Sequence, residues 1–270
     1  MIQKIGPVIL EAAEVLVEKQ QKLNSLKVEN KPGEGLVSEA DLKSEEILLK
    51  GIKKHFPGHF ILSEEDTYHS KDNFQKAKEA PECWAIDPLD GTNNYLSGLD
   101  YYAISIGYSE GSELKFGAVY LPATKEMFYA NKGEGAFYQL GNETEKKLEP
   151  EEKPCKVFAQ SSFISCLSVL RKNPEKLEAF HRVSEEALMV RRFGSAAADL
   201  CYTALGRFDG FWDRGLNPWD MHGGALICAE ANLQVRNQLN SSFNPFDPAI
   251  MVGRKHLIDK LYQLVKPSLI

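Results

Sequence analysis

The sequence predicts a mixed fold of the α/β (α+β) class, in which helices cover large β-sheets. Three features of the chain support this prediction. Apolar residues recur at helical spacing near the N-terminus, short apolar runs between turn residues follow, and strands then alternate with helices. The 270 residues are 43% hydrophobic and 26% charged, a composition that excludes wholesale disorder.

Two amphipathic helices are expected first. The apolar face of the first helix is formed by Ile5, Ile9, Ala12, Leu16 and Leu23. A Gly/Pro-rich break at 31–35 separates it from the second helix. We expect that helix to begin at Ser38, with Asp41 three residues later completing a capping box, and to end at Pro57.

Short strands are expected next, and their turns indicate hairpins. The predicted strands are 60–62, 84–86, 103–108, 116–120 and 127–129. Turn residues at 111–112, 122–123 and 131–133 predict antiparallel pairing among the later strands.

The polar, charge-rich stretch 142–154 is predicted to separate two lobes of one compact fold. The lobes would be residues 1–148, which carry the acidic motif described below, and residues 149–270, which complete the site. In the second lobe we expect strands at 156–159, 190–193, 210–212 and 249–252, and helices at 175–188, at 196–205, after Trp219 and up to Val265.

Charge and cysteine content exclude several classes of protein. A net charge of −6 argues against a surface that binds nucleic acid directly. No window approaches 18 uncharged apolar residues, so no membrane span is expected. The cysteines are odd in number and widely spaced (Cys83, Cys155, Cys166, Cys201 and Cys228), and we see no secretion signal. These features suit a reducing cytoplasm.

The strongest motif is the stretch 84–94, where an apolar strand leads into Asp87. Pro88 is expected at the second position of a turn that brings Asp87 and Asp90 together. Two neighbouring carboxylates disfavour double ionisation unless a cation neutralises them, and oxygen ligands suit Mg²⁺. Gly91 permits close approach of a ligand, and a helical turn starting at Thr92 would offer N–H groups to a phosphate. The alternative is an ordinary Asp-Pro turn with an aspartate cap.

Two further acidic positions are less specific by themselves. The three acidic residues 64–66 follow a predicted strand. Taken alone, they are also consistent with a solvated loop. Asp220 opens a helix rich in small residues, where a helix N-cap is the simpler interpretation.

Together these motifs resemble the inositol monophosphatase family of Mg²⁺-dependent, lithium-sensitive phosphatases, over nearly the whole chain. The matching elements, in order, are Val37-Ser-Glu-Ala-Asp41, Ser63-Glu64-Glu65, Asp87-Pro-Leu-Asp90-Gly-Thr92-x-Asn94, Ala103-Ile-Ser-Ile-Gly107, Gly194-Ser-Ala-Ala197 and Trp219-Asp220 with Gly223 and Glu230-Ala231. The resemblance implies a layered αβαβα sandwich and a homodimer.

The resemblance also implies roles for individual residues. It implies two or three Mg²⁺ ions bound by Glu64, Asp87, the Leu89 carbonyl, Asp90 and Asp220. It places Asp41, Thr92 and Glu64 in the catalytic group, with Asp41 and Thr92 orienting the nucleophilic water. The implied substrate contacts are Leu89, Asp90, Gly91, Thr92, Gly194, Ser195, Ala196, Asp213 and Asp220.

The implied reaction is hydrolysis of inositol 1-phosphate to inositol and phosphate by metal-activated water. Departures from the family pattern concern the substrate: Asp213 replaces the usual Glu and is one methylene shorter, and His222 stands where a small residue is usual. Alternatives are a phosphatase of the same fold acting on fructose 1,6-bisphosphate, 3′-phosphoadenosine 5′-phosphate or histidinol phosphate, or a partner-binding regulator of transcription.

Overall fold

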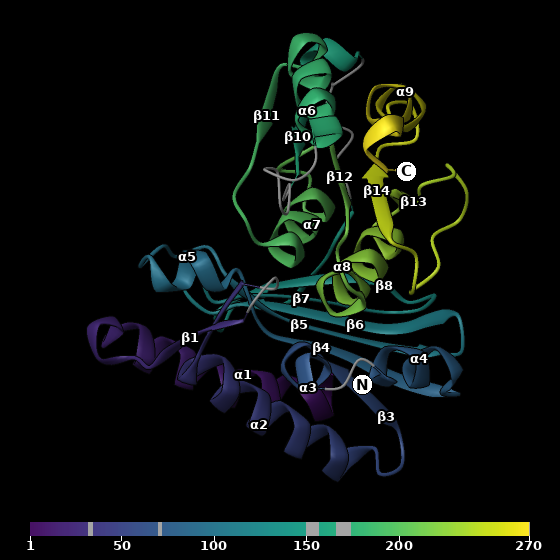
Figure 1. The fold of residues 1–270 in the computed structure, drawn as a ribbon. Coiled ribbons are helices and arrows are strands. Elements are labelled where there is room, and N and C mark those ends of the chain that lie inside the picture. Colours follow the sequence, from purple (N-terminus) through teal and green to yellow (C-terminus); the bar gives the residue numbers. More distant parts are fainter. Residues whose placement is uncertain (32–34, 70–71, 150–156, 166–173, 270) are drawn as a thin grey trace.

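The computed structural model describes residues 1–269 apart from 32–34, 70–71, 150–156 and 166–173. Helices and sheets alternate in layers (Figure 1). Helices α1 (Ile2–Gln20) and α2 (Glu39–His55) cover one face of a seven-stranded sheet, and α7 (Ala196–Ala204) and α8 (Pro218–Glu230) cover its other face. A five-stranded sheet follows, and α6 (Pro174–Glu186) and α9 (Ile258–Leu269) close the outside. The predicted αβαβα arrangement is confirmed.

The larger sheet contains the predicted hairpins. Its strands, in spatial as well as chain order, are β3 (Phe60–Ser63), β4 (Glu82–Asp90), β5 (Ala103–Glu110), β6 (Glu113–Leu121), β7 (Glu126–Asn131), β8 (Gly135–Leu140) and β9 (Lys146–Lys147). β3 and β4 are parallel, and every later neighbour is antiparallel. The parallel first pair brings the C-terminal ends of β3 and β4 to the same edge of the sheet.

The smaller sheet has the spatial order β11 (Met189–Arg191), β10 (Ser162–Ile164), β12 (Gly210–Arg214), β14 (Ala249–Gly253) and β13 (Gln234–Arg236). The strand predicted at 156–159 is wrong where it is described, because 158–160 form a short 3-10 helix and the strand begins at Ser162. The rings of Phe158 and Phe163 stack with their centres 4.7 Å apart. The apolar Phe158 therefore packs against a strand and is not part of one. Lys156 lies outside the described residues.

Several short elements complete the chain. They are η1 (Leu23–Ser25), the hairpin of β1 (Val28–Lys31) and β2 (Gly35–Ser38), α3 (Glu64–His69), α4 (Asp72–Glu79), α5 (Thr92–Leu96) and η2 (Phe158–Gln160). The boundary predicted at 142–154 is described only as far as Glu149, so the division into two lobes stays a prediction. Within the described part of the chain, no helix combines the length and apolar character needed to cross a membrane.

Helix α8 lies unusually close to the larger sheet. Along β5 the side chains alternate, so that Ile104 and Ile106 face α1 and α2 while Gly107 faces α8. A Cβ atom on Gly107 would lie 2.2 Å from the Cβ of His222, and the Ser105 hydroxyl donates to the carbonyl of Trp219 at 2.8 Å. The backbone of α8 is therefore held directly against the strands of the sheet.

Candidate metal centre

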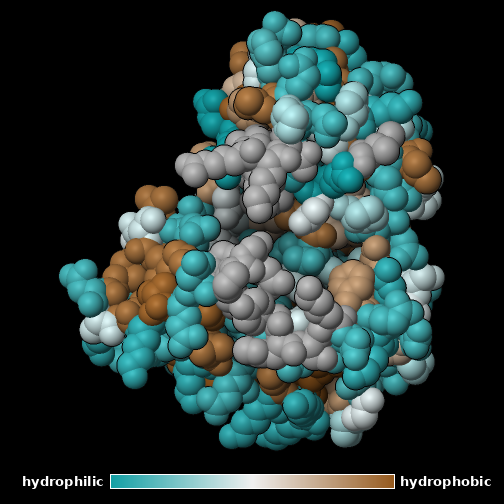
Figure 2. All heavy atoms as spheres, in the orientation of Figure 1, coloured by the Kyte–Doolittle hydropathy of each residue, from teal (hydrophilic) through white to brown (hydrophobic). Residues whose placement is uncertain are grey.

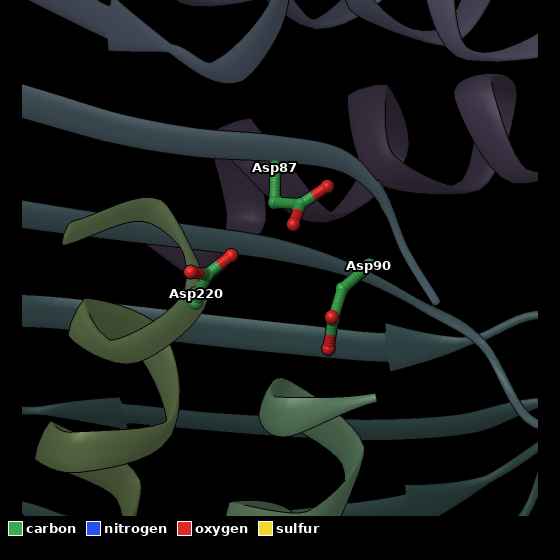
Figure 3. Close-up of side chains that lie close together, drawn as sticks. All are labelled: Asp87, Asp90 and Asp220. Atoms are coloured by element: carbon green, nitrogen blue, oxygen red, sulfur yellow. The ribbon is translucent and has the colours of Figure 1, made fainter. Parts of the chain in front are cut away.

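Three carboxylates from two distant parts of the chain meet beside the larger sheet. Asp87 and Asp90 lie at the end of β4, and Asp220 lies in the first turn of α8 (Figure 3). Each offers an oxygen, and these atoms all lie within 4.8 Å of one another. Asp87 and Asp90 are buried and Asp220 is half-buried. A group of this kind could hold a cation.

A β-bulge brings Asp87 and Asp90 to the same side of β4. Asp87 pairs with Ser105 and Asp90 with Ala103, so three residue steps in β4 match two in β5. Residues three apart in a regular strand face opposite sides, and the extra residue corrects this. The predicted turn is therefore wrong in type, because the chain bulges within the strand. Pro88, which has no N–H to contribute to a ladder, suits the bulge.

The electrostatics of the group are unfavourable without a positive charge. Burial, followed by the charges of Glu64, Asp90 and Asp220, raises the pKa of Asp87 well above its usual range. Burial raises the pKa of Asp90 to about 6, and burial with the nearby Asp90 charge raises the pKa of Asp220 to about 7. Among the described residues, no lysine or arginine pairs with any of the three aspartates.

The hydrogen bonds of the three carboxylates fit a cation site. One oxygen of each is anchored: Asp87 Oδ1 accepts from the N–H of Leu89 at 2.9 Å, and Asp220 Oδ2 accepts from the N–H of Asn217 at 2.6 Å. Asp90 Oδ2 accepts from the Ser195 hydroxyl at 2.6 Å and from the N–H of Ala197 at 2.7 Å. The second oxygen of each can serve as a ligand, and an all-oxygen set suits a hard cation such as Mg²⁺.

Asp220 does not occupy the N-cap position that we expected from the sequence. Asn217 is the N-cap of α8, Pro218 is the first helical residue, and Asp220 is the third. Proline is favoured at the first position, where its missing N–H costs nothing. The carboxylate of Asp220 reaches back to the backbone of Asn217, which holds its side chain beside the cluster.

The two other predicted metal ligands lie beside this group. Glu64 is the first residue of α3, directly after β3, and its charge contributes to the raised pKa of Asp87. It is not among the three residues whose ligand atoms lie within 4.8 Å. The Leu89 carbonyl accepts a hydrogen bond from the Thr92 hydroxyl at 3.1 Å. The five-ligand set stays a prediction.

Asp41 is fully buried and contacts both its own helix start and Thr92. Its Oδ2 accepts from the N–H of Ser38 at 2.9 Å and from the Ser38 hydroxyl at 2.6 Å, which confirms the predicted capping box. Its Oδ1 accepts from the Thr92 hydroxyl at 3.1 Å. Burial raises the pKa of Asp41, and these hydrogen bonds oppose the shift. The helix cap and the contact with Thr92 are therefore compatible.

The predicted phosphate and substrate segments adjoin the acidic group. Gly91 has φ +93° and caps α5, and Gly194 has φ +91° in the loop before α7. Ser195 is the N-cap of α7, and its hydroxyl is committed to Asp90. The structure thus brings Gly91, Thr92, Gly194 and Ser195 close to the acidic cluster, with Ala196 beginning α7.

Asp213 stands in a buried ion pair. Its Oδ1 accepts from Nζ of Lys176 at 2.9 Å and from the N–H of Arg214 at 2.7 Å. The side chains of Lys176 and Asp213 are 4% and 1% exposed, and Lys176 also donates to the carbonyl of Arg214. The sequence analysis did not single out Lys176, because one lysine in an amphipathic helix normally faces solvent. The contact predicted between Asp213 and the substrate stays a prediction.

Two other residues hold the backbone of the site through hydrogen bonds that the sequence did not predict. The Ser44 hydroxyl of α2 donates to the carbonyl of Pro88 at 2.9 Å and so holds the bulge. The side-chain amide of Asn94 donates to the carbonyls of Tyr101 and Phe193. Asn94 belongs to the acidic motif quoted above, but its spacing carried no indication of these partners.

Comparison with known proteins finds one matching family, similar sequences and a similar solved structure. The Inositol monophosphatase family matches residues 2–268. The chain is 34% identical over 257 residues to a fructose-1,6-bisphosphatase/inositol-1-monophosphatase of Aquifex aeolicus, covering 95% of this chain and 92% of that protein. It is 31% identical over 220 residues to the Nus factor SuhB of Pasteurella multocida, covering 82% and 78%. Among solved structures, the extragenic suppressor protein suhB of Bartonella henselae superposes with a TM-score of 0.86 at 28% identity, covering 98% of each chain.

Proposed function

Because this chain belongs to the inositol monophosphatase family, we propose that it is a Mg²⁺-dependent phosphomonoesterase that hydrolyses inositol 1-phosphate to inositol and phosphate. The observation that carries the proposal is the group formed by Asp87, Asp90 and Asp220, which is held together without a cationic side chain among the described residues. Family membership supports a phosphatase, and inositol 1-phosphate as its substrate is our proposal.

Asp87, Asp90 and Asp220 would hold Mg²⁺, with Glu64 and the Leu89 carbonyl beside them. The chemistry supplied by bound Mg²⁺ is neutralisation of the phosphate charge and a lowered pKa of water. The N–H groups of Gly91 and Thr92 would hold the phosphate at the start of α5. The loop of Gly194, Ser195 and Ala196 would face the alcohol portion of the ester.

The pair of Asp41 and Thr92 would orient the attacking water. The Thr92 hydroxyl has one hydrogen and two acceptors at 3.1 Å, Asp41 Oδ1 and the Leu89 carbonyl. With the carbonyl engaged by Mg²⁺ in the proposed site, the hydrogen would go to Asp41, and the oxygen lone pairs of Thr92 could accept a hydrogen bond from water. The buried Asp41 charge favours this direction of the hydrogen bond. Water held in this way presents an oxygen lone pair to the phosphorus, which lowers the entropic cost of reaction.

A panel of phosphate esters tests the proposal. The purified protein with Mg²⁺ is offered inositol 1-phosphate, fructose 1,6-bisphosphate, 3′-phosphoadenosine 5′-phosphate and histidinol phosphate, and kcat/KM is measured for each. We expect the highest value for inositol 1-phosphate, and a higher value for another ester contradicts the substrate assignment. The Aquifex relative, whose name covers two of these activities, is the reason to include fructose 1,6-bisphosphate.

Lithium gives a second test of the same site. Li⁺ is similar to Mg²⁺ in size but has half its charge, so it can occupy a Mg²⁺ site without supporting the same chemistry. We expect inhibition by Li⁺ that is uncompetitive with respect to the ester. Li⁺ at tens of millimolar is on the order of the concentration needed to shift occupancy of the Mg²⁺ site. Full activity at that concentration would contradict the expected inhibition.

A regulatory role is the second candidate, because one relative is a Nus factor. Purified protein that hydrolyses no ester in the panel at any Mg²⁺ concentration would favour binding over catalysis. We also expect a cytoplasmic homodimer, and analytical ultracentrifugation measures its assembly directly.

A further inference from the structure

The side chain of Asn94 joins two separate segments at the edge of the site. Asn94 is the third residue of α5, and its Nδ2 donates to the carbonyl of Tyr101 at 2.8 Å and to the carbonyl of Phe193 at 2.8 Å. These acceptors are 7 and 99 residues away in the sequence. One hydrogen of the amide group therefore ties α5 to the segment before β5, and the other ties it to the loop that precedes α7.

The segments joined by Asn94 also touch directly. A Cβ atom on Gly91 would lie 3.2 Å from the carbonyl oxygen of Tyr101 and 3.3 Å from the Cβ of Ser195. A Cβ atom on Gly194 would lie 3.5 Å from Nδ2 of Asn94. The rings of Tyr101 and Phe193 pack with their centres 5.0 Å apart. The backbone around Gly91 and the backbone around Gly194 are thus fixed at close range, with Asn94 between them.

We propose that Asn94 is a positioning residue, which sets the spacing between the segment that holds the phosphate and the loop that faces the alcohol. The inference rests on the proposed function for the identity of these two segments. The two carbonyls and the amide that joins them are independent of that assignment.

The chemistry of the contact explains why an amide is needed. Two carbonyl oxygens converge on one nitrogen, and the two hydrogens of the asparagine NH₂ group can serve both without adding a charge. A carboxylate at the same place would put an oxygen against two oxygens and leave both acceptors without this donor. The loop would then move away from α5, and a displacement of about 1 Å in a reacting group can cost roughly 100-fold in rate.

The experiment compares Asn94→Asp with Asn93→Asp. Asn93 is the exposed neighbour in the same helix, so the control adds the same charge without removing the bridge. We measure kcat/KM for inositol 1-phosphate and the inhibition constant of inorganic phosphate, which has no alcohol portion for the Gly194 loop to contact. For Asn94→Asp we expect kcat/KM to fall roughly 10- to 100-fold below the control, with the inhibition constant changed less than about twofold.

Two activity outcomes would overturn the proposal. One is a kcat/KM for Asn94→Asp within about fivefold of the Asn93→Asp control. The other is an equal loss in kcat/KM and in phosphate affinity, which indicates general damage rather than misplacement of one loop. If Asn94→Asp does not fold, Asn94→Ala removes the donor without adding charge and is judged by the same two criteria.

Hydrogen exchange separates this inference from the proposed function. If the wild-type protein hydrolyses no ester, the proposed function fails, and the amides of 193–197 are compared instead. Faster exchange of these amides in Asn94→Asp than in Asn93→Asp supports the bridge. Equal exchange in the two variants overturns it.

Discussion

At the scale of single residues, Asp41 allows its structural and chemical contributions to be separated. One carboxylate oxygen accepts from Ser38 and the other accepts from Thr92. In Asp41→Asn the amide oxygen can keep the cap, while the amide nitrogen faces Thr92 and reverses that hydrogen bond. We expect a small change in melting temperature and a fall in kcat of roughly 10²- to 10⁴-fold, the range for losing an acid–base partner.

Two further variants check this interpretation. Thr92→Val should lower kcat by a similar factor, and the double variant should be little worse, because the two residues act as a unit. Ser38→Ala is the matched control, since it removes the cap but not the contact with Thr92. It should cost about 0.5–2 kcal/mol of stability with kcat nearly unchanged. Losses that multiply in the double variant would contradict the coupling.

Asp90→Asn tests the cation site itself. The substitution keeps the size of the side chain but removes one charge from the group of three, so we expect turnover to fall by several orders of magnitude, on a scale of about 1.4 kcal/mol per tenfold. Asp72→Asn, at an exposed aspartate in the first turn of α4, is the control and should leave turnover unchanged. Retention of more than about a tenth of the wild-type kcat would rule out Asp90 as a ligand.

The raised pKa values also predict how stability depends on pH without metal. The folded pKa values of Asp90 and Asp220 are about 6 and about 7, above the usual value of 3.8. At pH values between the usual pKa of 3.8 and the raised pKa values, the folded protein binds more protons than the unfolded chain. The free energy of unfolding therefore decreases as pH rises through this range. Urea unfolding in a chelator should show this loss between about pH 4 and pH 7. Excess Mg²⁺ should reduce it, and an identical slope with Mg²⁺ would count against the site.

The sequence singled out the carboxylates that the structure brings together, but not how they are brought together. Asp87 and Asp90 were identified from an apolar strand that leads into them, and Asp220 was included only through the family resemblance. Pro88 is equally consistent with a turn and with a bulge, and only pairing with β5 decides between them. The partnership of Lys176 with Asp213 depends on two elements 37 residues apart, so no local pattern could reveal it.

At the scale of elements, the contact between α8 and β5 predicts a strong effect of one methyl group. In Gly107→Ala the new Cβ would lie 2.2 Å from the Cβ of His222, where no flexible side-chain end can move aside. Overpacking of this kind costs about 1–3 kcal/mol or more. Because α8 also carries Asp220, we expect a weaker apparent affinity for Mg²⁺ together with the lower stability.

Gly6→Ala in α1 is the control for this variant. Its Cβ would make an ordinary contact at 3.6 Å with Ile2, and alanine should stabilise the helix by up to about 1 kcal/mol. Urea unfolding and the Mg²⁺ dependence of turnover are measured for both variants. If Gly107→Ala has the stability and Mg²⁺ dependence of the wild type, α8 does not pack against β5 as closely as described.

Among the elements, those with strong periodicity or clear turns were predicted, the short strands β3 and β11 among them, whereas β8 and β13 were missed. Leu23, expected on the first helix, lies in η1 after that helix has ended. The capping box placed the start of α2 correctly, and the turns between β5, β6 and β7 gave their antiparallel pairing. The exposed edge strand β9 has two residues, too few for any pattern. Helix α4 was missed because its sequence is almost entirely polar, with Ala77 as its one buried residue.

At the scale of the whole molecule, the two halves of the chain are expected to depend on each other. Helix α8 and α7 bury one face of the larger sheet, including Val119, Phe128 and Ala130. A fragment of residues 1–148 lacks both helices and would expose this apolar face. We expect it to bind a hydrophobic dye and to show no cooperative unfolding, and co-expression with 149–270 should restore folding. A cooperative transition in the isolated fragment would show instead that the first lobe is autonomous.

The face shown in Figure 2 is mostly hydrophilic, with a group of hydrophobic atoms at its left, near α5 and β1 in the same view of Figure 1. Exposed apolar side chains include Leu99 and Val28, which are 54% and 44% exposed.

The hydrogen bonds that Asp90 accepts from Ser195 and Ala197 span 105 and 107 residues of sequence. Such distant contacts require closure of a long loop, and their formation is expected late in folding. Interactions that are absent from the folding transition state affect the rate of unfolding more than the rate of folding. A cation bound between β4 and α8 should therefore leave the folding time nearly unchanged and lengthen the lifetime of the folded protein. The supply of metal would then determine how long the folded protein survives as well as how fast it turns over substrate.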